Sequence, residues 1–290
     1  MRVHGLSDFY GNIAVLKYLL PGILLLALLA VLIPGDGGEW YSKITEPAFL
    51  LANALLALWV ALMYRGALRS AFLFLTGFFT LYGLFNIENL VEQAQQALDG
   101  NFLRALLAYQ IVTYLFLLLA CWQILKVISV KQLSKGGWLV VLGGLALAIG
   151  ILLFFIPVFS DFLGFNALPD EFAVLNLLVR IFDVTVMVLL LPVIWLYVQH
   201  ARAKYQESAT FTIVALGIIA SLVLVYITEL LTWQPIAEVV DETLVINQES
   251  HAGTYLDTLY IFGYLLIGTG LFLHRKHQEW SFKKVESLLK

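Results

Sequence analysis

The stretch Glu171–Val198 reads EFAVLNLLVRIFDVTVMVLLLPVIWLYV, and Arg180 and Asp183 are the charged residues within it after Glu171 itself. A helix crosses the roughly 30 Å of bilayer hydrocarbon with about 20 apolar residues, so this stretch predicts a transmembrane helix. A charge near the bilayer centre costs at least about 2.5–3.5 kcal/mol, and such residues generally face the interior of a helix bundle. The sequence therefore predicts a membrane protein with a candidate site around Arg180 and Asp183.

The composition of the whole chain supports the same class of protein. Of 290 residues, 61% are hydrophobic and only 13% are charged, and the mean hydropathy is +0.89. A soluble domain of this length does not require so much apolar surface. The formal net charge is −3, and no long basic tract indicates nucleic acid as a partner. The single cysteine, Cys121, excludes an intramolecular disulfide and is expected in the apolar core.

Eight apolar segments are close to the length that a membrane crossing requires. They cover residues 13–34, 47–65, 70–88, 104–127, 137–159, 171–198, 209–231 and 254–274. We therefore expect an all-α polytopic membrane protein with eight transmembrane helices, built as one integral membrane domain over residues 1–290. Residues 277–290 are expected to form a short cytoplasmic tail.

Prolines and polar residues mark the expected ends of the spans. Four prolines are predicted at or beyond helix ends, where they cause no strain. They are Pro34, Pro47, Pro157 and Pro169. Pro192 falls inside the sixth span and is predicted to kink it. Segment 89–103 is too polar to cross the bilayer, and we expect it to lie on the outer surface as a short amphipathic helix.

The connections between the spans alternate in charge. Lysine and arginine follow the second, fourth, sixth and eighth spans, at Arg65, Arg69, Lys126, Lys131, Lys135, Arg202, Lys204, Arg275, Lys276, Lys283, Lys284 and Lys290. The opposite connections are acidic, with Asp36, Glu39, Glu46, Glu92, Asp99, Asp161, Asp170, Glu171, Glu238, Asp241, Glu242 and Glu249. The positive-inside rule then places both termini in the cytoplasm. We expect a multi-pass protein of the plasma (inner) membrane.

The two halves of the sequence, residues 13–128 and 137–276, resemble each other weakly. The motif VLIP ending at Pro34, for example, is similar to FFIP ending at Pro157. A four-plus-four internal repeat keeps both halves in the same orientation, related by an axis along the membrane normal. Leucine-rich composition can produce the same similarity, so it stays an alternative explanation.

Helical spacing gathers polar residues onto single faces of several spans. On the sixth span, Asn176, Arg180 and Asp183 share one face. The other candidate residues are Asn86 and Glu88 on the third span, Gln110 on the fourth, Glu229 on the seventh, and Asp257 and Tyr260 on the eighth. In the predicted orientation this second set lies toward the external ends of its spans, whereas Arg180 and Asp183 lie near the midplane. Together they predict a polar cleft that opens outside and ends at Arg180 and Asp183.

The charges in this cleft favour a cation or a proton as its ligand. Arg180 supplies one positive charge. Asp183, Glu229 and Asp257 supply up to three negative charges. A buried acid that Arg180 does not neutralise can hold a proton, as in proton-coupled proteins. The alternatives are an anionic ligand that pairs with Arg180, and a purely structural ion pair between Arg180 and Asp183.

Small-solute or ion-coupled transport or binding is the function that this cleft predicts. The expected partners are membrane lipids and an unidentified small solute, cation or proton. A non-catalytic subunit or assembly factor of a larger membrane complex is the main alternative, and other membrane subunits would then be partners. A membrane sensory module or a lipid-acting enzyme is a further alternative, although the spacing of the acids indicates no particular reaction.

We assign no catalytic residue, metal or cofactor. The histidines fall in tails, loops or span ends, at His4, His200, His251, His274 and His277, so none of them is placed to clamp a haem in the bilayer centre. His274 and His277, with Arg275 and Lys276, are expected to form a basic cytoplasmic rim against lipid headgroups. Several glycines are expected at close helix contacts: Gly143, Gly144, Gly150, Gly263, Gly268 and Gly270.

Overall fold

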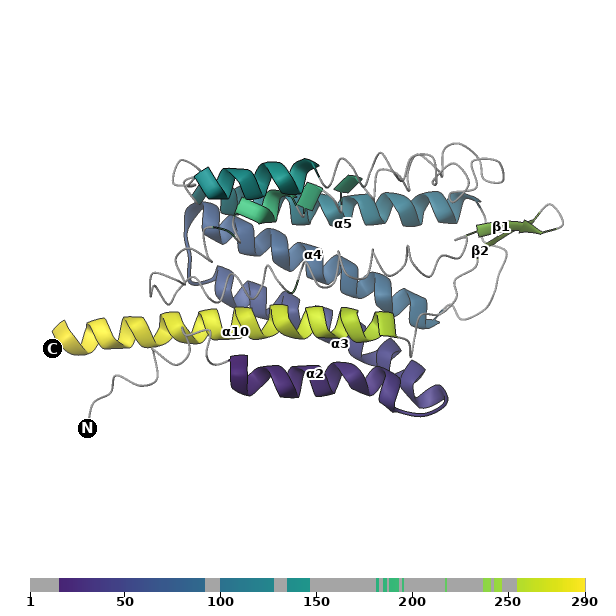
Figure 1. The fold of residues 1–290 in the computed structure, drawn as a ribbon, viewed down its shortest axis with the longest axis horizontal. Helices are drawn as coiled ribbons and strands as arrows, with labels where there is room; N and C mark the ends of the chain where they lie inside the picture. Colours follow the sequence, from purple (N-terminus) through teal and green to yellow (C-terminus); the bar gives the residue numbers. More distant parts are fainter. Residues whose placement is uncertain are drawn as a thin grey trace.

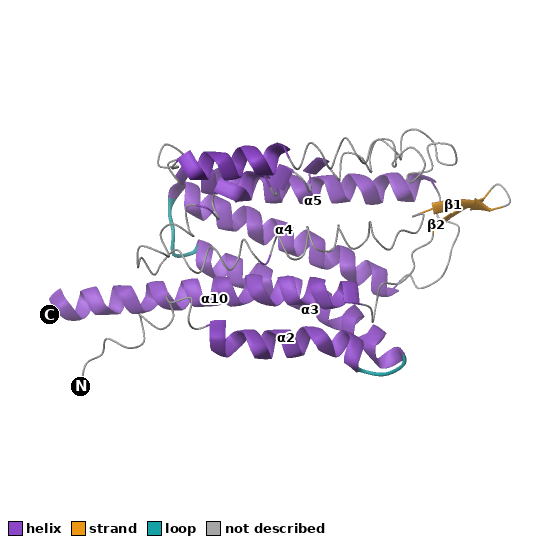
Figure 2. Ribbon diagram, in the orientation of Figure 1, coloured by secondary structure: helices purple, strands orange, loops and turns teal. Residues whose placement is uncertain are grey.

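The computed structural model describes residues 16–91, 100–127, 135–146, 181–182, 185–186, 188–192, 195, 217, 237–240, 243–246 and 255–289, and the statements below concern those residues. The elements in chain order are α2 (Leu16–Leu32), α3 (Asp36–Ala61), α4 (Gly66–Val91), α5 (Gly100–Val127), β1 (Ala237–Val240), β2 (Thr243–Ile246) and α10 (Tyr255–Leu289). A shorter apolar helix covers Lys135–Ala146. The long helices run alongside one another as a bundle (Figures 1 and 2).

Four helices in the described part of the chain are long and apolar enough to cross a membrane. They are Asp36–Ala61, Gly66–Asn86, Ala108–Val127 and Tyr255–Glu279, and they overlap the predicted second, third, fourth and eighth spans. The helical membrane class is therefore confirmed, with four candidate spans. α2 overlaps the predicted first span and is apolar but shorter. The eight-span count and the internal repeat depend largely on residues outside those described, and they stay predictions.

α3 begins at Asp36, about three turns before the predicted start at residue 47. The prediction of a helix end at Pro47 is therefore wrong, because Pro47 lies buried inside α3. Hydropathy reports only the lipid-facing length of a helix, whereas the polar first turns of α3 pack against α2. Gly35, at φ 62°, reverses the chain between the two helices without steric strain. Acidic Asp36 and Glu39 in the first turn of α3 then complement its helix dipole.

The predicted surface helix over residues 89–103 is wrong at both of its ends. α4 continues to Val91 and α5 begins at Gly100, so these ends prolong two spanning helices. The helical hydrogen-bonding pattern continues past the apolar part of each helix, which composition alone does not reveal. Residues 92–99 lie outside the described residues.

A small β-hairpin interrupts the otherwise helical architecture. β1 and β2 pair antiparallel, with Ala237 opposite Ile246 and Val240 opposite Thr243. The hairpin projects from the end of the bundle at which α10 begins, whereas the C-terminal end of α10 projects at the opposite end (Figure 1). The all-α expectation does not include this element, whose β-branched residues favour extended backbone.

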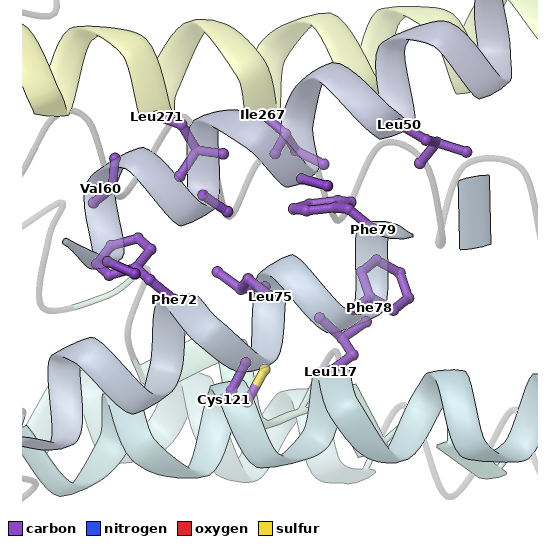
Figure 3. Packing of buried hydrophobic residues seen from close by; sticks show 14 of the residues in the cluster. Leu50, Val60, Phe72, Leu75, Phe78, Phe79, Leu117, Cys121, Ile267 and Leu271 are labelled. Carbon is purple, nitrogen blue, oxygen red and sulfur yellow. The ribbon is translucent and has the colours of Figure 1, made fainter. Parts of the chain in front are cut away.

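A continuous apolar core lies between α3, α4, α5 and α10 (Figure 3). Its buried side chains include Leu50, Val60, Phe72, Leu75, Phe78, Phe79, Leu117, Cys121, Ile267 and Leu271. Cys121 is thus a core residue, as expected. Ala54, Ala57 and Ala61 are also buried on α3, and small side chains let helices in a membrane approach closely. This core fixes which faces of α3 and α10 meet.

Glycines lie at close contacts between helices. A Cβ at Gly268 would lie 2.5 Å from Oδ1 of Asn53, in agreement with the predicted close packing. The prediction is wrong for Gly143, which has open space around it. Gly217, outside the predicted set, lies so close to α10 that a Cβ there would be 2.8 Å from the carbonyl oxygen of Gly263.

Candidate functional site

Polar side chains line the contact between α3 and α10. Glu46 and Asn53 are seven residues apart on α3, and Asp257, Tyr260 and Tyr264 follow one another at spacings of three and four on α10. These spacings keep each set on one helix face. Asp257 is 4% exposed and Tyr264 is 3% exposed. The two polar faces meet because α3 and α10 pack directly against each other.

The carboxyl groups of Glu46 and Asp257 lie within hydrogen-bonding contact of each other. Glu46 as a residue is half-buried, but its carboxyl oxygen Oε1 is shielded from solvent and has no hydrogen-bond partner. A hydrogen bond between two carboxyl groups requires a proton on one of them. The contact therefore brings together two acids from different helices, beside a buried acceptor oxygen that no donor reaches.

Tyrosines from two helices surround this carboxyl pair. The hydroxyl group of Tyr264 is hydrogen-bonded to that of Tyr82 on α4, and its other electrostatic neighbours are Glu46 and Tyr260. The ring of Tyr264 stacks on that of Tyr260 at a centroid distance of 6.0 Å and meets that of Tyr82 edge-on at 6.5 Å. The site therefore combines two acids with hydroxyl groups and aromatic faces.

Asn53 joins the same two helices by a hydrogen bond deeper in the bundle. It is 2% exposed, and its Nδ2 donates a hydrogen bond to the carbonyl oxygen of Tyr264 at 2.9 Å. Interhelical hydrogen bonds of this kind hold membrane helices in register. This bond fixes the axial position of α10 relative to α3 and so keeps Asp257 next to Glu46.

Replacing Asn53 with alanine is expected to lower the free energy of unfolding by about 1 kcal/mol, because it removes an interhelical hydrogen bond. Asn86→Ala is the matched control, since the amide of Asn86 donates to the carbonyl of Tyr82 on its own helix at 2.9 Å. Unfolding by a denaturing detergent would measure both. Equal losses for the two variants would contradict a special role for the Asn53 contact.

Some of the predicted site residues are among the described residues, and others are not. Asp257 and Tyr260 belong to the α3–α10 site. Asn86 bonds to its own helix and Gln110 is half-buried on α5, so neither is shown to join the site. Asn176, Arg180, Asp183 and Glu229, and the side chain of Glu88, lie outside the described residues. Convergence on Arg180 therefore stays a prediction.

Glu46 and Asn53 are the site residues that the sequence reasoning missed. With a helix boundary predicted at Pro47, Glu46 falls in an acidic external connection. With α3 extended to Asp36, Glu46 and Asn53 fall on one face of a single helix. That seven-residue spacing is the signal in the sequence that could have identified them.

The predicted basic cytoplasmic rim is wrong for its two histidines, which are buried. His274 is 3% exposed and His277 is 6% exposed. The imidazole Nε2 of His274 is hydrogen-bonded to the hydroxyl group of Tyr64, and its ring stacks on Tyr64 and Phe72 at centroid distances of 5.7 and 6.0 Å. His274 faces the bundle because α10 packs there against Tyr64 and Phe72, at and after the α3–α4 junction.

Arg275 and Lys276 are also engaged within the protein. Arg275 donates a hydrogen bond to the carbonyl oxygen of Trp59 at 3.1 Å, and its guanidinium lies 4.8 Å from the centroid of the Trp59 ring. Both cations pair with Glu279, at 2.9 and 3.2 Å. This end of α10 is an anchor to α3 and resembles no ligand site.

An apolar groove of about 440 Å³ lies beside the site, between α2, α3 and α10. Asn53 and Tyr264 are among its lining residues, together with apolar side chains such as Phe49, Leu56 and Phe272. The groove therefore meets the inner boundary of the acid–tyrosine site.

No protein-family model, curated protein or solved structure matches this chain significantly. Within the described residues, no three His, Cys, Asp or Glu side chains are grouped to hold a metal ion. The function must therefore be inferred from the contact between α3 and α10.

Proposed function

We propose that this protein binds and transports a small solute, coupled to a proton or another cation, through a polar cleft that opens outside. The carboxyl pair of Glu46 and Asp257 carries this proposal. Ionisable side chains within membrane spans are costly, and they mark ion pathways, proton relays and substrate sites. Two neighbouring acids that share one proton are equipped for such coupling.

The proposed architecture keeps the eight spans, the four-plus-four repeat and cytoplasmic termini in the plasma membrane. Glu46 lies about three turns into α3, and Asp257 lies in the first turn of α10. Both helices begin at the same end of the bundle (Figure 1), which the charge pattern assigns to the outside. The pair then lies in the outer half of the membrane. Arg180 and Asp183 close the cleft near the midplane in this proposal.

Cysteine accessibility tests whether the site is open to external water. The starting protein carries Cys121→Ala, which removes the single cysteine of the chain. Tyr260→Cys then places a thiol beside the acid pair without altering either acid. We expect a membrane-impermeant thiol reagent, applied to intact cells, to label this cysteine, because a solute-binding cleft must be hydrated from one side.

Two further cysteines make the result interpretable. Asp36→Cys, in the exposed start of α3, should be labelled, whereas Leu117→Cys, fully buried in the core, should not. If Asp36→Cys reacts and Tyr260→Cys does not, the site is closed to the outside and the transport proposal fails. A scaffolding role in a membrane complex would then explain the bundle better.

A further inference from the structure

We infer, on the basis of the function proposed above, that Glu46 and Asp257 form a cation–proton exchange site. The empty pair holds one proton, and one monovalent cation that binds at the carboxyl groups displaces it. The balance is one proton released for one cation bound, so the net charge of the site does not change.

Within the described part of the chain, the electrostatic neighbour shown for the carboxyl group of Glu46 is another acid. The titratable groups next to Glu46 or to its tyrosine neighbour are Asp257, Tyr260 and Tyr264 from α10 and Tyr82 from α4. On its own helix, Lys43 is paired with Glu39 and lies over the ring of Trp40. On α2, Tyr18 lines the groove next to Asn53 and Tyr264, and residues 19–32 contain no titratable side chain. Among the described residues, the titratable groups shown around Glu46 are therefore acids and tyrosine hydroxyl groups.

The buried oxygen Oε1 of Glu46 is the place that a cation would fill. It has no hydrogen-bond donor, and a buried carboxyl oxygen without a partner carries the cost of its lost hydration. A cation bound there would satisfy it directly. The hydroxyl group of Thr258, which follows Asp257 in the chain, is likewise buried without a hydrogen-bond partner.

A single positive charge fits this site better than a double one. Hard divalent ions prefer more carboxylate ligands than the two that meet here, and within the described residues no third His, Cys, Asp or Glu side chain joins them. Carboxyl and hydroxyl oxygens suit an alkali ion, and the faces of Tyr260 and Tyr264 suit an alkylammonium group. An alkali ion and an alkylammonium group both carry a single positive charge, so either would fit the exchange.

Proton release on cation binding tests the exchange directly. The intact purified protein, in weakly buffered detergent solution with a pH indicator dye, receives sodium, potassium or tetramethylammonium chloride in separate experiments. We expect about one proton per protein in at least one of these arms. We also expect the apparent affinity for that cation to rise about tenfold per pH unit while the site is protonated.

Substitution of each acid distinguishes proton release at this site from a general effect of ionic strength on the measured pH. Glu46→Gln keeps the shape of the protonated acid but cannot exchange, so its release should be abolished. Asp257→Asn should abolish it as well and serves if Glu46→Gln fails to fold. Glu279→Gln is the matched control, because Glu279 lies on the same helix as Asp257 and pairs with Arg275 and Lys276 outside the site. It should release as much as the unaltered protein.

The arms of this experiment identify the source of the charge. Proton release with sodium or potassium alone indicates that the site binds an alkali ion. Proton release with tetramethylammonium alone indicates an organic ammonium ligand. Proton release with both kinds of salt indicates a site that recognises a single positive charge of either kind. No release in any arm, or equal release from Glu46→Gln, would overturn the exchange. If Tyr260→Cys is nevertheless labelled from outside, the proposed function survives and only the exchange is rejected.

Discussion

Replacing Gly38 with leucine is expected to lower the free energy of unfolding by about 3 kcal/mol. A Cβ at Gly38 would lie 2.4 Å from the carbonyl oxygen of Ala30 and 3.0 Å from that of Ile33. Both atoms belong to the backbone, so no rotation of a side chain can relieve the overlap. α2 and the N-terminal end of α3 would have to separate, and their buried contact would be lost.

Gly22→Leu is the matched control for this substitution. It makes the same exchange on α2, where nothing lies within 4 Å of the position that a Cβ would occupy. Unfolding in mixed micelles of increasing sodium dodecyl sulfate would compare the two variants. A Gly38→Leu protein as stable as the Gly22→Leu protein would show that α2 and α3 do not approach as closely as described. Because Glu46 follows Gly38 by about two turns on α3, cation-induced proton release should weaken as well.

The sequence predicts the helices of this bundle best along their apolar stretches. The predicted span 70–88 lies within α4, and the predicted span 254–274 starts one residue before α10, because an apolar run long enough for the bilayer has little alternative to a helix. The ends were predicted poorly. α3 starts at Asp36 and α10 continues to Leu289, since helical hydrogen bonds persist in water where hydropathy gives no signal.

The site was predictable along one helix and not between helices. The spacing of Asp257 and Tyr260 was enough to place both on one face of α10. Their neighbours on α3 were hidden, because a contact such as that of Asn53 with Tyr264 joins residues 211 positions apart in the chain. Nothing in a single sequence specifies which helices pack together.

Tyr264 joins the apolar core to the acid pair, and two substitutions are expected to separate these roles. Tyr264→Ala removes a buried aromatic ring from the core formed with α3, α4 and α5, and we expect a loss of about 3–5 kcal/mol in the free energy of unfolding. Tyr264→Phe keeps the ring and removes only the hydroxyl group. Its cost should be about 1 kcal/mol, the usual contribution of one hydrogen bond.

The phenylalanine variant is the informative one for function, because it leaves the packing intact next to Glu46. The hydroxyl group of Tyr264 bonds to that of Tyr82, so Tyr82→Phe should have a similar effect, and the double variant should lose less than the sum of the two. If the hydroxyl pair supports the exchange site, both single variants should weaken cation-induced proton release while remaining folded. Unchanged release in Tyr264→Phe would assign this residue to packing alone and would confine the exchange chemistry to the two carboxyl groups.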